Sequence, residues 1–308
     1  MELRQLARDL QVSRIGLGCN NFGTRLDPEG STEVVRTALD EGVTHFDTAT
    51  MYGNGRSEEI LGKALAGQRD QVVIATKAIP RPREVDYKPG VLARSIEDSC
   101  EASLRRLSTD RIDLYYQHVP DPDAPLEEAI EALNGLVAKG KARHVACSNY
   151  SADQRRQAEG IATGTGASHL LANQVEWNLL NRAIEADIVP AAHEVGMSII
   201  PFFPLASGML TGKYTMRRPF PTGSRLASAP YFATLATEEN FEYVEKLSAF
   251  AQAYGHSILE LAIAWLCAQE SVPSVIIGAM NPEQVRSNVA AAEWKLDDDV
   301  LAALPSRP

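Results

Sequence analysis

Cysteine is scarce in this sequence, and no two cysteines have the spacing of a metal-binding or disulfide motif. The four cysteines among 308 residues are Cys19, Cys100, Cys147 and Cys267. Without a CxxC pair they indicate neither a disulfide framework nor a zinc cluster. We therefore expect four buried thiols, because free cysteine is among the most buried residue types.

Positive charge and long apolar runs are also lacking. Forty acidic residues against 30 basic ones give a formal net charge of −10, which argues against nucleic acid or an anionic membrane surface as a partner. No stretch reaches the roughly 18 to 20 apolar residues that a transmembrane helix needs. The first residues, MELR, lack the apolar core of a signal peptide. These absences predict a cytoplasmic protein without a membrane partner.

A third absence concerns nucleotide-binding motifs. Gly16 and Gly18 begin a GxGxxG fingerprint, but Asn21 stands where the third glycine is required. Because the motif fails, the sequence gives no sign of a Rossmann-type dinucleotide site.

Short β-rich apolar runs alternate with longer amphipathic helical patterns along the chain, which is typical of repeated βα units. The predicted strands are 14–17, 45–47, 72–76, 112–118, 144–148, 170–175, 198–203 and 274–277. Eight strands, each followed by a helical stretch, favour an α/β fold of the closed (β/α)8 TIM barrel type over an open doubly wound sheet, which usually has fewer strands. We predict one domain over residues 1–308.

Three other segments add to the plain barrel. Residues 3–6 and 10–12 indicate an N-terminal β-hairpin that plugs the bottom of the barrel. The connections 78–90 and 204–237 are long loops after strands, so we expect both at the C-terminal face as active-site loops.

Polar residues at the ends of successive predicted strands are candidates for catalysis. Asp47 ends the second strand with Tyr52 one turn later, Lys77 follows the third strand, and His118 ends the fourth. A buried lysine beside a tyrosine favours the phenolate and lowers the phenol pKa from about 10, and the aspartate keeps the lysine charged. Such a tyrosine can act as a general acid/base while the histidine orients a carbonyl oxygen. The alternative is that these residues only satisfy backbone groups at strand ends.

These residues belong to longer motifs that carry a family resemblance. The motifs are HFDTATMYG (45–53), IATK (74–77), YYQH (115–118), ACSNY (146–150), NQVEWN (173–178), PLASGMLTGKY (204–214) and IGAMNPEQ (277–284). Together they resemble the aldo-keto reductase superfamily, in its bacterial-type branch similar to potassium-channel β-subunits. The resemblance covers essentially the whole chain and implies catalytic roles for Asp47, Tyr52, Lys77 and His118.

The resemblance also implies a nicotinamide dinucleotide bound in an extended form. Its nicotinamide end would lie beside Asp47, Ser148, Asn149 and Gln174, with Phe202 stacked on the ring. The remaining contacts implied for the diphosphate and adenosine are Pro204, Leu205, Ser207, Lys213, Arg225, Gly278, Met280, Gln284, Ser287 and Asn288. The adenosine set begins at a helix N-terminus, with Asn281 as the predicted cap and Gln284 as its reciprocal partner.

The residues around position 280 bear on the choice between the two dinucleotides. Many relatives place a lysine or arginine between positions 278 and 284, whereas this chain has the uncharged Met280 and Gln284. We expect NADP(H) as the preferred cofactor and NAD(H) as the second choice.

The resemblance places the substrate against another set of residues, which are Asn20, Phe22, Tyr52, Tyr87, His118 and Val119. Three positions depart from the common family pattern, namely Thr50, Val119 and Trp177, and none belongs to the proposed tetrad. Asn20, Phe22 and Val119 indicate an uncharged pocket, which favours an aldehyde, ketone or alcohol over a strongly acidic substrate.

Two functional classes follow from these features. The leading hypothesis is an oxidoreductase that transfers hydride between the nicotinamide and a small carbonyl or alcohol substrate, with Tyr52 as general acid/base. The alternative is a regulatory subunit that binds the cofactor with little turnover. A metal-dependent hydrolase is disfavoured, because the strand ends do not supply a set of histidine and carboxylate ligands.

Overall fold

Eight parallel strands form the centre of the computed structural model, which describes residues 1–79, 81, 84–216, 218–228 and 230–307. They are β3 (Ile15–Gly18), β4 (His45–Asp47), β5 (Val73–Ala78), β6 (Ile112–Gln117), β7 (Ala142–Ser148), β8 (Ala172–Glu176), β9 (Ser198–Phe202) and β10 (Val275–Gly278). The sheet order is β10-β3-β4-β5-β6-β7-β8-β9. Near its open edge the Ile199 amide donates to the Ser271 carbonyl at 2.8 Å. The predicted (β/α)8 barrel is confirmed, and every predicted strand lies within two residues of an observed one.

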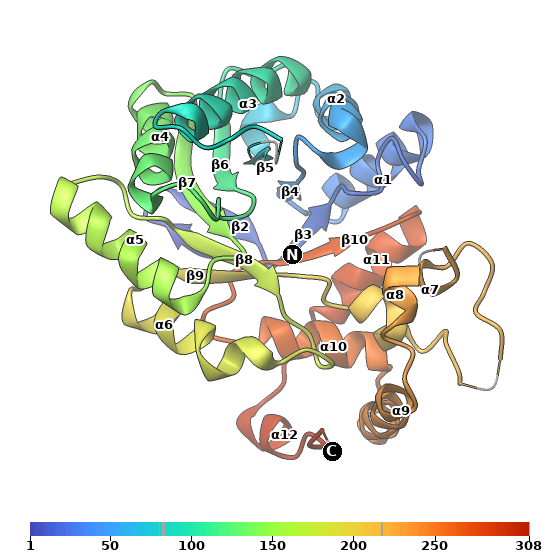
Figure 1. Ribbon diagram of the computed structural model, residues 1–308. Helices are drawn as coiled ribbons and strands as arrows, with labels where there is room; N and C mark the ends of the chain where they lie inside the picture. The colour runs from blue at the N-terminus through green and yellow to red at the C-terminus, as the bar shows by residue number, and fades with distance from the viewer. Residues whose placement is uncertain (80, 82–83, 217, 229, 308) are drawn as a thin grey trace.

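Helices surround the strands, as Figure 1 shows. Those that follow the first six barrel strands are α1 (Pro28–Asp40), α2 (Arg56–Ala64), α3 (Val91–Leu107), α4 (Leu126–Ala138), α5 (Ala152–Thr165) and α6 (Ile188–Glu194). The rest are α7 (Arg225–Ser228), α8 (Pro230–Ala233), α9 (Glu238–Ala253), α10 (Ile258–Cys267), α11 (Pro282–Ala291) and α12 (Asp298–Ala302). Short 3-10 turns cover Tyr52–Gly55, Arg69–Gln71, Ala183–Ala186 and Ala206–Thr211.

Alternation along the strands explains how polar residues reach the inside of the barrel. Phe46 packs in the outer core between the strands and helices, so its neighbours His45 and Asp47 face the opposite way. Asp47 is the last residue of β4, and its register partner in β5 is Ala75. This geometry delivers a carboxylate to the C-terminal mouth of the barrel, where Lys77 of β5 also lies.

The predicted N-terminal hairpin is confirmed as β1 (Leu3–Ala7) and β2 (Leu10–Ser13), which pair antiparallel. Leu6, Leu10 and Val12 pack against strand residues inside the barrel, including Val73 and Leu114. These contacts come from the beginnings of the strands, so the hairpin closes the N-terminal end.

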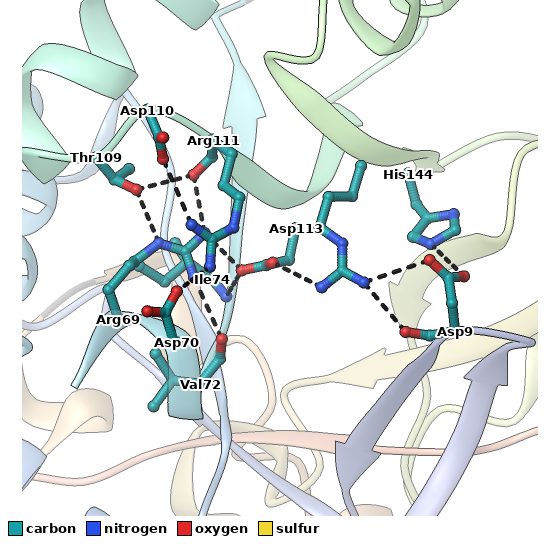
Figure 2. Close-up of polar contacts among 11 residues, drawn as sticks. Asp9, Arg69, Asp70, Val72, Ile74, Thr109, Asp110, Arg111, Asp113 and His144 are labelled. Atoms are coloured by element: carbon teal, nitrogen blue, oxygen red, sulfur yellow. Dashed lines mark hydrogen bonds and ion pairs between the residues drawn. The ribbon is translucent and has the colours of Figure 1, made fainter.

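A polar network ties the turn of this hairpin to the barrel (Figure 2). Asp9 lies 3.0 Å from His144 Nε2 and 3.3 Å from Arg143 Nη2. Arg143 reaches Asp113 at 3.4 Å, and Arg69 contacts the other oxygen of Asp113 at 2.8 Å. The chain of ion pairs therefore links the hairpin to β6, β7 and the turn before β5, at the end of the barrel opposite the candidate site.

The two predicted long loops and the predicted N-cap at Asn281 are also present. The described parts of segments 78–90 and 204–237 follow β5 and β9 and so lie at the C-terminal face. Residues 80, 82–83, 217 and 229 of these segments lie outside the described residues. The N-cap of α11 is Asn281, whose side chain accepts from the Gln284 amide at 2.9 Å. We predicted that the Gln284 side chain would bond the cap residue Asn281 in return. It instead accepts from the amide of Met280, one residue earlier.

Candidate active site

A large cavity opens among the C-terminal ends of the strands. Its volume is about 700 Å³, within the range of roughly 300 to 1,000 Å³ typical of small-molecule sites. The elements that line it are the ends of β3, β4, β8, β9 and β10, the loops after β6, β7 and β9, and the first turns of α11. Asp47, Tyr52 and His118 are at one end of its lining, and Met280, Gln284 and Asn288 belong to α11 and the loop before it.

Three of the predicted catalytic residues meet around one ammonium group. Lys77 Nζ donates to Asp47 Oδ1 at 2.5 Å and to the Thr48 carbonyl at 2.8 Å. The same nitrogen lies 5.3 Å from the centre of the Tyr52 ring. Lys77 is fully buried, so Asp47 supplies the counter-charge that a buried cation requires.

Burial changes the expected acidities of Tyr52 and Lys77. It raises the pKa of the Tyr52 phenol above its usual value of 10, and the Lys77 cation lowers that pKa by a smaller amount. For Lys77, burial opposes the charge, but Asp47 and Tyr52 together outweigh it and raise the pKa of the ammonium. The net fall that we predicted for the phenol pKa is therefore wrong for the protein alone, because the desolvation of Tyr52 outweighs the cation.

His118 faces Tyr52 across the end of the cavity. The two rings are 6.0 Å apart and nearly perpendicular, at 83°. Burial, helped by Lys77, lowers the pKa of His118 from 6.5 to about 3. The imidazole is therefore neutral at physiological pH, and its Nδ1 is buried with no hydrogen-bond partner in the described part of the chain.

Amide and hydroxyl groups continue from Asp47 toward the middle of the cavity. Gln174 Nε2 donates to Asp47 Oδ2 at 2.8 Å, and Ser148 Oγ donates to the Gln174 carbonyl at 2.8 Å. Asn149 Nδ2 donates to the His118 carbonyl at 3.1 Å and to Ser148 Oγ at 3.0 Å. These bonds fix the three predicted carboxamide-binding side chains in one connected set.

Unusual backbone conformations are concentrated in the cavity wall. Phe203, Ser207 and Asn149 are non-glycine residues of the lining with φ values of 52°, 56° and 61°. Left-handed backbone costs an L-residue roughly 1 to 2 kcal/mol, and such strain occurs preferentially at functional sites. A Cβ at Gly208, where φ is 97°, would lie 2.8 Å from Lys213 Nζ. The glycine thus lets the cation approach the loop.

Three cations line the cavity, although the protein is acidic overall. They are Arg25, Lys213 and Arg225, and none forms an ion pair with a carboxylate of the described residues. Arg225 lies over the rings of Phe203 and Phe232 at 5.4 and 5.5 Å. Burial, together with the nearby Arg25, lowers the pKa of the Arg225 guanidinium. Like charges held together without a counter-charge suit an anionic ligand.

Most of the predicted cofactor residues line this one cavity. Those in its lining are Asp47, Ser148, Asn149, Gln174, Phe202, Pro204, Leu205, Ser207, Lys213, Arg225, Gly278, Met280, Gln284 and Asn288. Ser287 is exposed and lies outside the lining, because the helix turns its side chain away from the neighbouring Asn288.

The predicted substrate residues divide into two groups. Asn20, Tyr52 and His118 line the cavity, whereas Phe22, Tyr87 and Val119 do not. Phe22 is fully buried in the core. The Tyr87 hydroxyl donates to Glu128 Oε2 of α4 at 2.7 Å, which directs its side chain away from the cavity. Val119 is 37% exposed on the loop after His118.

The structure adds lining residues that sequence reasoning missed. Arg25 donates from Nη2 to the Gly223 carbonyl at 2.5 Å, which joins the loop after β3 to the loop after β9. Phe203 and Thr211 also line the cavity. No motif marks Arg25. Only its position three residues before α1, close to Asn20 and Asn21, could have drawn attention to it.

Metal-binding clusters and membrane-spanning helices are both absent from the residues that the structure describes. No group of three or more histidine, cysteine or carboxylate side chains able to hold a metal was found in the described residues. Over the same residues, no helix has the length and apolar character needed to cross a membrane.

Comparison with known proteins agrees with the geometry. Residues 14–306 match the model of the Aldo/keto reductase family. The chain is 35% identical over 302 residues to the aldo-keto reductase YhdN of Bacillus subtilis, covering 94% of this chain and 88% of the relative. It is 34% identical to a probable voltage-gated potassium channel subunit beta of Arabidopsis thaliana, covering 100% and 99% of the two chains. The chain therefore belongs to the aldo/keto reductase family.

Proposed function

We propose that this protein is an oxidoreductase that transfers hydride between a nicotinamide dinucleotide and an aldehyde, ketone or alcohol. Aldo/keto reductases are generally NAD(P)H-dependent oxidoreductases, which agrees with this proposal. The observation that carries it is the buried Lys77, which bonds Asp47 and lies beside the Tyr52 ring at the cavity end that His118 also lines.

Tyr52 is the proposed general acid/base. Its raised pKa keeps the phenol protonated at neutral pH, so it can give a proton to the oxygen of a carbonyl substrate during reduction. Lys77 stabilises the phenolate that remains, and Asp47 keeps Lys77 charged. Neutral His118 orients the same substrate oxygen through a hydrogen bond. In alcohol oxidation the phenolate takes the proton back.

The cavity residues fit a nicotinamide dinucleotide. When bound, the nicotinamide supplies or accepts the hydride. Ser148, Asn149 and Gln174 would hold its carboxamide, because they offer amide and hydroxyl groups in a fixed set. The three lining cations, Arg25, Lys213 and Arg225, and the Gly208 turn would hold the diphosphate.

The cations also favour a preference for NADP(H) over NAD(H). Met280 and Gln284 bring no charge to the adenosine end. Arg25 and Arg225 lie in the same cavity and form no ion pair with any carboxylate that the structure describes. Charge-assisted hydrogen bonds contribute roughly 1.5 to 3 kcal/mol each, and one such bond to a 2′-phosphate gives a preference of about one to two orders of magnitude.

The Tyr52→Phe variant tests the catalytic proposal. We expect turnover of aldehydes and ketones to fall by about 10²- to 10⁴-fold, because only the proton donor is lost. Reduced cofactor should still bind with unchanged affinity. Tyr254→Phe, at a tyrosine outside the cavity lining, is the matched control and should keep full turnover. Wild-type turnover in Tyr52→Phe would contradict the assignment, and cofactor binding without turnover in the parent protein would favour the regulatory alternative.

Titration of NADPH and NADH by tryptophan fluorescence tests the cofactor preference. We expect tighter binding of NADPH, and loss of that advantage in Arg225→Ala or Arg25→Ala with NADH affinity little changed. Equal or tighter binding of NADH by the parent protein would reject the preference. Exposed Arg36→Ala in α1 is the control and should leave both affinities unchanged.

A further inference from the structure

A fully buried carboxylate outside the cavity takes no part in the proposed chemistry. Glu58 belongs to the first turn of α2, which lies beside α3 on the outside of the strands (Figure 1). Its Oε1 accepts from the Thr76 hydroxyl at 2.6 Å, and its Oε2 accepts from Arg106 Nε of α3, also at 2.6 Å. None of these three residues lines the cavity. Apolar residues of the same volume often stabilise a fold as well as a buried ion pair does, so stability alone does not account for this one.

One end of the ion pair is attached to the strand that carries Lys77. Thr76 directly precedes Lys77 in β5, and successive side chains of a strand point to opposite faces. Lys77 therefore points into the barrel toward Asp47, while Thr76 points outward to α2. The bond to Glu58 fixes the outer face of the strand at the residue next to the ammonium group.

The other end of the pair lies against the turn that carries Tyr52. The last three residues of the turn Tyr52–Gly55 have left-handed backbone, with φ values of 58°, 55° and 88°. A Cβ at Gly55 would lie 2.7 Å from Arg106 Cδ and 2.9 Å from Arg106 Nε. The arginine side chain is thus packed directly on the backbone that follows the phenol.

A chain of hydroxyl groups makes a second connection between the same parts. Arg106 Nη2 donates to Ser103 Oγ at 3.4 Å, and this oxygen lies 3.1 Å from Thr50 Oγ1. The Thr50 hydroxyl donates to the Lys77 carbonyl at 3.0 Å. Thr50 stands two residues before Tyr52. Arg106 therefore contacts the chain after Tyr52 directly and the chain before it through Ser103.

We propose that the Glu58–Arg106 ion pair is a positioning pair, which holds Tyr52 and Lys77 at their working separation from outside the barrel. This inference rests on the proposed function, in which Tyr52 is the general acid/base. The separation that the pair maintains is the one between Lys77 Nζ and the centre of the Tyr52 ring, which is 5.3 Å.

Glu58→Gln tests the proposal, because it keeps the size of the side chain and removes its charge. Single-turnover reduction of benzaldehyde or butanal by bound NADPH measures the chemical step. We expect its rate constant to fall by about tenfold to 10²-fold, since an error of about 1 Å in a catalytic geometry has an effect of this size. The alkaline limb of its pH profile should move upward, because a more distant Lys77 lowers the pKa of the phenol less. NADPH affinity should be unchanged.

A double-mutant cycle shows whether the two residues act together. Arg106→Met removes the other partner, and we expect it to slow the step about as much as Glu58→Gln does. The double variant should be about as slow as either single variant, because both remove the same constraint. It leaves no unpaired buried charge, so it also serves where Arg106→Met alone does not fold. Additive losses would contradict a shared role.

Asp113→Asn is the matched control (Figure 2). Asp113 pairs with Arg69 at 2.8 Å, and the two side chains are 2% and 18% exposed. The corresponding values for Glu58 and Arg106 are 0% and 22%. Asp113 also accepts a bond from β5, through the Ile74 amide, but at the end of the barrel opposite the cavity. The control should lose stability in urea unfolding and keep the rate constant and pH profile of the parent protein.

The outcomes separate this inference from the proposed function. A rate constant and pH profile like the parent's in Glu58→Gln, or an equal loss in Asp113→Asn, would overturn the positioning pair. Absence of turnover with every carbonyl compound in the parent protein would instead refute the proposed function. Ultraviolet titration of the phenol, taken as the difference between proteins with and without Tyr52→Phe, still reports on the pair in that case. An equal pKa of Tyr52 in the parent and Glu58→Gln backgrounds would then overturn it, and a higher pKa in Glu58→Gln would support it.

Discussion

Protonation of His45 should weaken the fold below neutral pH by an amount that follows from its surroundings. The imidazole is fully buried one position before Phe46 in β4, with Nδ1 2.9 Å from Ser274 Oγ. Its Nε2 has no partner in the described part of the chain. Burial, with a contribution from Lys77, lowers the pKa of His45 from 6.5 to about 4.

The sign and size of the effect follow from proton linkage. Between pH 6.5 and 4 the unfolded chain binds a proton at His45 that the folded protein refuses, so folding is favoured at the upper end and loses stability as the pH falls. Each pH unit is worth about 1.4 kcal/mol. The loss attributable to His45 is therefore about 3 kcal/mol, complete near pH 4.

Urea unfolding of the parent protein and of His45→Gln, at pH 7 and at pH 4, measures this loss. We expect the drop in the free energy of unfolding between the two pH values to be about 3 kcal/mol smaller in the variant. His118 is present in both proteins, so its own titration cancels in the difference. His193→Gln, at an exposed histidine of α6, is the control and should behave as the parent does. Identical pH dependence in the parent and His45→Gln would refute the reasoning.

Three further predictions concern catalysis, the substrate loops and helix packing. Lys77→Met should lose turnover and move the alkaline limb of the pH–rate profile upward, because the cation that lowers the phenol pKa is gone; an unmoved limb would contradict this. Arg81→Met should raise KM for ketones while leaving the Kd of NADPH unchanged, since it frees the loops after β5 and β6, on the substrate side only. Gly62→Ala should destabilise the protein by about 1 to 3 kcal/mol, because its Cβ would lie 2.5 Å from the Leu107 carbonyl oxygen. Gly160→Ala, in open space within α5, should instead stabilise by about 0.5 to 1 kcal/mol, and thermal or urea unfolding distinguishes the two.

The barrel was predictable because its signal is repeated and local. The predicted strand 112–118 and the observed β6 (Ile112–Gln117) differ by one residue. Leu114, Tyr115 and Tyr116 are residue types that favour a buried strand, and all three are fully buried. The convergence of Asp47, Lys77 and His118 followed from the same topology, because all three stand at the C-terminal ends of neighbouring strands.

What the sequence could not supply depends on depth and on distant contacts. It shows that a lysine accompanies Tyr52, but the direction of the phenol pKa depends on how much water the fold removes. The Arg25–Gly223 bond joins residues 198 positions apart, and nothing local marks either partner. Tyr87 stands in a loop near the mouth, yet its contact with Glu128 of α4 is decided by tertiary packing.

Asp47 gives one oxygen to Lys77 and the other to Gln174. The first bond belongs to the groups proposed to move the proton, and the second to the groups that would receive the dinucleotide. A ligand that changes the bond to Gln174 changes the charge available to Lys77, and thermodynamic reciprocity requires the converse. On the proposed assignment, proton and dinucleotide would be heterotropic ligands that communicate through a single carboxylate.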